Sequence, residues 1–113
     1  MFEAQFAHGG PTMLDFTPTV NVAAGEVVVT ADTPRVAHLA IAANTLGALA
    51  GTGGVYRVAG AAAIATNKKV FWDNTTNQVT ESAAAGVNKA FGVTASACSG
   101  AAAFCLVRHD PAM

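Results

Sequence analysis

Charged residues are scarce in this 113-residue chain, where only 12% are Asp, Glu, Lys or Arg against about 25% in an ordinary soluble domain. The six basic residues are scattered apart from Lys68-Lys69, and the formal net charge is −1. Binding to phosphates needs a concentrated basic stripe that displaces counterions, so nucleic acid is excluded as a partner. So little charge would leave a monomer with much exposed Ala and Val, which favours burial against copies of the chain or against a partner.

Groupings of polar residues that catalysis or metal binding would need are also missing. No metal-ligand spacing links the three histidines to one another or to the two cysteines, and no two carboxylates share a spacing for acid/base work. Gly51 to Gly54 lacks the Gly-Lys-Ser/Thr of a P-loop and is interpreted as a flexible hairpin loop. His8-Gly9-Gly10 resembles the oxyanion loop of lipases, but the Gly-x-Ser-x-Gly nucleophile is absent. We therefore expect no enzyme activity, no metal site and no cofactor.

Long apolar runs are absent as well. The longest candidate, Val36 to Val55, is interrupted by His38, Asn44, Thr45 and several glycines, so no bilayer helix and no membrane partner are expected. The first residues carry Glu3 and His8 where a signal peptide would have a basic region and then an apolar run. No targeting segment is therefore predicted.

The two cysteines, Cys98 and Cys105, leave two alternatives open. A last hairpin that turned symmetrically about Ala101 and Ala102 would place them opposite each other, close enough for a cross-strand disulfide. Nothing in the chain signals an oxidising compartment, however, so buried free thiols are the favoured interpretation.

The most informative stretch that is present runs from Lys69 to Glu81 and contains the only Trp. Val70 to Trp72 are strand formers, Asp73 to Asn77 are residues typical of turns, and Gln78 to Thr80 resume an extended pattern. The stretch predicts a β-hairpin with Trp72 in or beside the core.

Short strand-like segments separated by turns recur along most of the remaining chain. We expect strands at Glu26 to Thr30, Arg35 to Ile41, Leu46 to Ala50, Val55 to Val58, Ala90 to Ala97 and Phe104 to Arg108. In Arg35 to Ile41 the alternation directs Ala37, Leu39 and Ile41 inward. Gly60 to Ala65 is rich in Ala and could form a helical turn. The fold class is therefore all-β, a small compact β-barrel or sandwich-like module over residues 25–113 with at most one short helix.

Residues 1–24 differ from this domain because they have no sustained period. They are interrupted by Gly9-Gly10, Pro11 and Pro18, which exclude a continuous helix. We interpret them as an extended N-terminal arm that crosses a neighbouring subunit or becomes ordered on a target. Its apolar side chains would be the partner-binding anchors: Phe2, Phe6, Leu14 and Phe16.

Several segments, taken in order over roughly Gly25 to Val107, resemble one family, the small capsid-cement or head-decoration proteins of tailed phages and prophages. The resemblance rests on Gly25 to Val28, Gly54 to Val58, Lys69 to Asp73 with Val79-Thr80, Phe91 to Val93 and Leu106-Val107. The Trp-Asp hairpin is the most specific of these. The family's early segment is usually shorter than residues 1–24.

The resemblance implies a β module that forms a homotrimer and binds the major capsid protein on the outer surface of an icosahedral head. Such a protein is made in the host cytoplasm, resides in the virion and stabilises the mature lattice against internal DNA pressure. The alternative function is a small carbohydrate- or protein-binding β module, in which an exposed Trp72 with Tyr56 would stack on a sugar ring.

Overall fold

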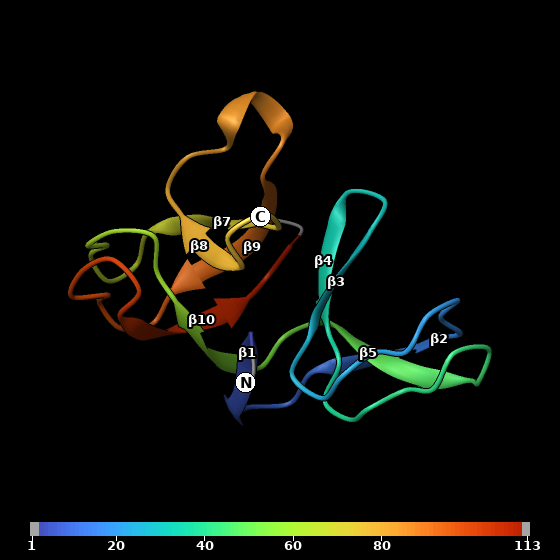
Figure 1. Cartoon of the computed structure of the whole chain (residues 1–113). Coiled ribbons are helices and arrows are strands. Elements are labelled where there is room, and N and C mark those ends of the chain that lie inside the picture. The colour runs from blue at the N-terminus through green and yellow to red at the C-terminus, as the bar shows by residue number, and fades with distance from the viewer. Residues whose placement is uncertain (1–2, 112–113) are drawn as a thin grey trace.

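Two antiparallel sheets make up the protein in a computed structural model that describes residues 3–111 (Figure 1). The six-stranded sheet has the order β1-β6-β10-β9-β7-β8 and the four-stranded sheet the order β2-β5-β4-β3. The predicted all-β class is confirmed, with a sandwich-like packing of two sheets and not a closed barrel. The strands are β1 (Ala4–His8), β2 (Thr12–Phe16), β3 (Val27–Thr30), β4 (Thr33–Val36), β5 (Gly47–Thr52), β6 (Val55–Ala59), β7 (Lys69–Asp73), β8 (Gln78–Thr80), β9 (Lys89–Thr94) and β10 (Phe104–His109).

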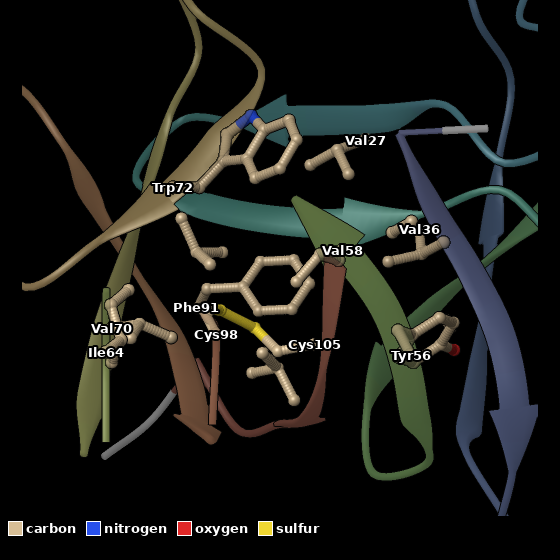
Figure 2. Close-up of a cluster of buried hydrophobic side chains, with 14 residues drawn as sticks. Val27, Val36, Tyr56, Val58, Ile64, Val70, Trp72, Phe91, Cys98 and Cys105 are labelled. Atoms are coloured by element: carbon tan, nitrogen blue, oxygen red, sulfur yellow. A yellow bond between two sulfur atoms is a disulfide. The ribbon is translucent and has the colours of Figure 1, made fainter. Parts of the chain in front are cut away.

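The main core lies between the two sheets (Figure 2). Trp72 and Phe91 of the six-stranded sheet share this core with Val27 and Val36 of the four-stranded sheet. Trp72 is 1% exposed, and its indole Nε1 donates a hydrogen bond to Asn74 Oδ1 at 3.1 Å. The prediction of a core Trp on a β-hairpin is therefore confirmed.

The hairpin turn uses the chemistry that its residues predict. One carboxylate oxygen of Asp73 accepts hydrogen bonds from the amides of Thr75 and Thr76. Asn77 adopts a φ of 57°, a left-handed conformation that Asn tolerates better than most residues. The turn sets the register in which Trp72 faces Val79.

Residues 4–16 differ from the predicted arm because they form strands inside the fold. β1 pairs with β6 of one sheet and β2 pairs with β5 of the other. Ala4 belongs to the main core. The break at Gly9 to Pro11, which excludes a continuous helix, is the point where the chain passes from one sheet to the other.

Gly51 to Gly54 is also not the predicted hairpin loop. Gly51 and Thr52 end β5, and Gly53 and Gly54 carry the chain directly into β6 of the other sheet. Both have positive φ, 83° and 80°, a conformation that glycine adopts at no steric cost. The two connections between the sheets lie in close contact, because a Cβ on Gly9 would lie only 3.0 Å from the Cα of Gly54.

Three smaller predictions also need correction. The segment predicted as a strand to Ile41 ends at Val36, and Leu39 is exposed rather than inward-facing. Gly60 to Ala65 is not helical, and its Ile64 is buried in a bridge to Cys98. Within residues 3–111 the only helix is the short 3-10 turn η1 (Ala84–Gly86).

The preference for free thiols is wrong, because Cys98 and Cys105 form a disulfide with their Cα atoms 4.9 Å apart. The two residues do not face each other in a simple hairpin. Cys98 lies in the loop after β9, and both its amide and its carbonyl bond to Ile64. The backbone bridge to Ile64 holds Cys98 beside β10, and the disulfide then closes the loop that connects β9 to β10.

Candidate functional site

The apolar surface of the four-stranded sheet is the strongest candidate for a functional site. Strands β2 and β5 and the connection 37–46 project away from the six-stranded sheet (Figure 1). We call these residues, 12–16 and 37–52, the β2–β5 lobe. β2 is an edge strand, and four of its five residues are exposed.

One groove of about 280 Å³ runs along this lobe and carries the most exposed leucines of the described chain. Leu39 is 76% exposed and Leu46 is 67% exposed, and Met13 of β2 lines the same groove. The turn after Ile41 brings the two leucines together, because the amide of Thr45 bonds to the carbonyl of Ala42 at 3.2 Å. Exposed apolar patches on small proteins mark contact with another macromolecule or a ligand.

Charge is absent from this groove. Its lining contains no Asp, Glu, Lys or Arg, and His38 is its only titratable member. Burial lowers the pKa of His38 below its ordinary value, which favours the neutral form. The groove therefore offers a partner an uncharged, apolar surface that is inexpensive to dehydrate.

The predicted anchors do not gather at one place. Phe6 of β1 lies against His38, with ring centroids 4.8 Å apart, and against Tyr56 at 5.6 Å. Leu14 lines a second groove of about 340 Å³ with Asp15, Phe16 and Arg35. Phe16 is half-buried and packs against the smaller core of Val22, Ala37, Ile41 and Leu49. Phe2 lies outside the described residues.

Sequence reasoning found Leu14 but missed Met13, Leu39 and Leu46. Leu39 was assigned an inward position because it continued the alternation of Ala37 and Ile41. The sequence feature that could have indicated their exposure is the Ala-Ala-Asn-Thr turn at residues 42–45. This turn reverses the chain between Leu39 and Leu46. Strand alternation does not continue through such a reversal, so a leucine beside it has no prescribed inward face.

The two aromatic residues that the carbohydrate-binding alternative requires are both buried. Trp72 and Tyr56 are 1% and 0% exposed, so neither offers a ring face to a carbohydrate. Residues 3–111 hold no group of three His, Cys, Asp or Glu side chains that could bind a metal ion. Over the same residues there is no helix with the length and apolarity to span a bilayer.

Comparison with known families decides the family of the chain. The sequence model of the phage cement protein family matches residues 7–109. The chain belongs to the phage cement protein family. This cement protein therefore has a capsid-associated role. The match includes Gly9 to Pro11 and β2, whereas the resemblance in the sequence begins only at about Gly25. No curated protein and no solved structure matches the chain.

Proposed function

We propose that this cement protein binds the major capsid protein on the outer surface of a phage head and stabilises the mature lattice. Family membership supports the capsid role, and the uncharged groove of the β2–β5 lobe supports docking through that lobe. In this proposal Met13, Leu39 and Leu46 are the main contacts. Leu14 contributes from the other side of β2, and Phe6 from the neighbouring groove that it shares with His38.

The mechanism is mass action. A protein that binds only the expanded lattice stabilises that lattice by its binding free energy, and the gain is repeated at every occupied site. Contact area rather than catalysis performs this function, so no reacting groups and no cofactor are needed. The protein would be made in the host cytoplasm and would reside in the virion.

The single observation that carries the docking proposal is the exposure of Leu39 and Leu46 beside one uncharged groove. Full burial of a leucine side chain contributes about 1.5–3 kcal/mol, and each 1.4 kcal/mol changes a dissociation constant about tenfold. We therefore expect Leu39→Ser and Leu46→Ser each to weaken binding to expanded capsids by about 10- to 100-fold. Sedimentation of capsids with increasing concentrations of each variant measures this change.

Val87→Ser is the matched control. Val87 is 75% exposed, but it follows η1 in the connection between β8 and β9 of the six-stranded sheet, outside the lobe. The control should bind like the wild type, and all three variants should unfold at the wild-type denaturant concentration because their side chains are already in water. Undiminished capsid binding by both leucine variants would show that the lobe is not the docking surface.

A further inference from the structure

The joint between the two sheets contains two hydrogen bonds made by histidine side chains. His38 Nε2 lies 2.6 Å from the hydroxyl of Tyr56, which joins the connection after β4 to β6. His109 Nε2 lies 2.8 Å from the carbonyl oxygen of Pro34, which joins β10 to β4. We call these contacts the seam. Neither bond follows from strand pairing, and each ties one sheet to the other.

His109 is the more deeply buried of the two, with 0% exposure. The carbonyl of Pro34 can only accept a hydrogen bond, so His109 Nε2 carries the proton and Nδ1 is the bare nitrogen. Nδ1 is buried and has no hydrogen-bond partner among residues 3–111. The ring is packed between Phe91, 4.9 Å away, and Tyr56, 5.8 Å away. A second proton would therefore create a buried charge and a donor without an acceptor.

The charged groups around the seam do not compensate for that charge. Burial and the positive charge of Arg35 lower the pKa of His109, while the Pro34 hydrogen bond and Asp110 partly oppose them. His38 faces the rings of Phe6 and Tyr56, and burial lowers its pKa. An ion pair between the half-buried Lys89 and the exposed Asp32, at 3.4 Å, also bridges the two sheets.

Glu3 is a third titratable group between the two sheets, and its protonation has the opposite effect on stability from that of the histidines. Its carboxylate accepts a hydrogen bond from the amide of Val27 at 2.6 Å. Burial raises the pKa of Glu3 above 4.5, with a smaller contribution from the nearby Glu26, against the lowering effect of the Val27 bond. Protonation of Glu3 therefore favours the folded state as the pH falls, which is opposite in sign to the effect of the two histidines.

We propose that the seam is acid-labile: acidification weakens the contact between the two sheets because a buried His109 and a half-buried His38 hold them together as neutral rings. The proposal concerns the isolated protein and does not rest on capsid binding. Both rings gain water as soon as the sheets separate, and a histidine in water accepts a proton readily. Acid therefore favours the separated state over the closed one.

The sign of the effect follows from linkage between protonation and folding. A histidine whose pKa is lower in the folded state gives full stability above its unfolded value near 6.5. Stability then falls as the pH drops from that value toward the folded pKa. For each histidine that takes up its proton only on opening, the opening equilibrium rises by about tenfold per pH unit inside this window.

The test is urea unfolding of the whole protein at pH 7.5 and pH 5.5, followed by Trp72 fluorescence. Trp72 reports on the joint because Val27 of the other sheet lies against it (Figure 2). The wild-type midpoint should fall at pH 5.5, and the double variant His38→Gln with His109→Gln should lose most of this dependence. Gln retains a neutral donor at the position of Nε2 but takes up no proton.

His8→Gln is the control, because His8 is an exposed histidine on β1. This variant should keep the pH dependence of the wild type. An unchanged wild-type midpoint, or a double variant as acid-sensitive as the wild type, would overturn the proposal.

Should the double variant fail to fold, histidine titration of the wild type by NMR decides the matter. The pKa of His38 and the pKa of His109 must then both lie below the ordinary histidine value of 6.5. If either histidine titrates at or above that ordinary value, the seam is not acid-labile.

Discussion

Gly92 occupies a position on β9 where no side chain fits. A Cβ built there would fall on the carbonyl oxygen of Arg108, on the neighbouring strand β10. The obstacle is backbone, so it cannot rotate away as a side chain would. Gly92 also faces His109 across this pair of strands, which places the close approach next to the seam.

We predict that Gly92→Ala destabilises the protein by about 1–3 kcal/mol or more, the range of overpacked sites. The free energy of unfolding in urea measures the loss. Gly100→Ala is the matched control, because a Cβ at Gly100 meets nothing within 4 Å and the substitution reduces the freedom of the unfolded chain. Equal stability of the two variants would mean that β9 and β10 are not so closely apposed.

Single residues whose roles depend on local sequence were the ones that sequence reasoning predicted well. Trp72 and the Asp73 turn are examples, because strand propensity and turn chemistry act within a few residues. The disulfide was not predictable in this way. Cys98 reaches Cys105 because Ile64, more than thirty residues earlier, holds the Cys98 backbone through two hydrogen bonds. The seven-residue spacing between the cysteines gives no information about that long-range contact.

At the scale of elements, strands β1 and β2 escaped prediction for a physical reason. In β1 only Ala4 is buried, and in β2 no residue is fully buried. Edge strands of this kind show no alternation of inward and outward residues, which is the signal that identifies a strand. Their partners, β6 and β5, lie between 31 and 54 residues further along the chain, as in the pairs Phe16–Gly47 and Ala4–Val58. Most of the other strands alternate and were located to within two or three residues.

Deletion of residues 1–16 distinguishes the observed fold, in which these residues form strands, from the hypothesis of a separable arm. A separable arm predicts that the truncated protein keeps its β-type circular dichroism and its stability. In the structure the deletion removes one strand from each sheet, uncovers the edges of β5 and β6, and removes the buried Ala4 and the Glu3 bond to Val27. We predict that the truncated protein unfolds at a clearly lower urea concentration or does not fold.

A point variant controls for the loss of surface anchors alone. Phe6→Ser with Leu14→Ser removes two of the predicted contacts and leaves the backbone pairing of β1 and β2 intact. This variant should remain folded. Wild-type stability in the truncated protein would restore the arm as a separate element.

At the scale of the whole molecule, the total surface area is that of an ordinary monomer, but the composition of the surface is unusual. Its accessible surface is 5707 Å², close to the roughly 5,700 Å² expected of a monomer of 11.3 kDa. The surface is ordinary in area but poor in charge. Apolar side chains are also exposed outside the β2–β5 lobe, and one of them is Phe104 on β10.

Phe104 is the first residue of β10, which belongs to the six-stranded sheet and not to the β2–β5 lobe. The guanidinium of Arg57 covers one face of its ring at 3.8 Å, and the ring borders a groove of about 470 Å³ with Gln78 and Ala102. If the lobe contacts the capsid, contacts between copies of the cement protein need a different surface. The Phe104 region meets that requirement.

We therefore predict a homotrimer, in solution or on the capsid, whose subunits meet near Phe104. Phe104→Ser should shift sedimentation of the free protein, or its distribution on the lattice, from trimers toward monomers, since an apolar anchor at an interface is replaced by a polar group. Leu39→Ser should leave the trimer unchanged while weakening capsid binding, so the two variants separate self-association from docking. A wild-type protein that is monomeric in solution and occupies capsid positions singly, away from three-fold axes, would contradict the trimer and leave the docking surface to be judged by Leu39 alone.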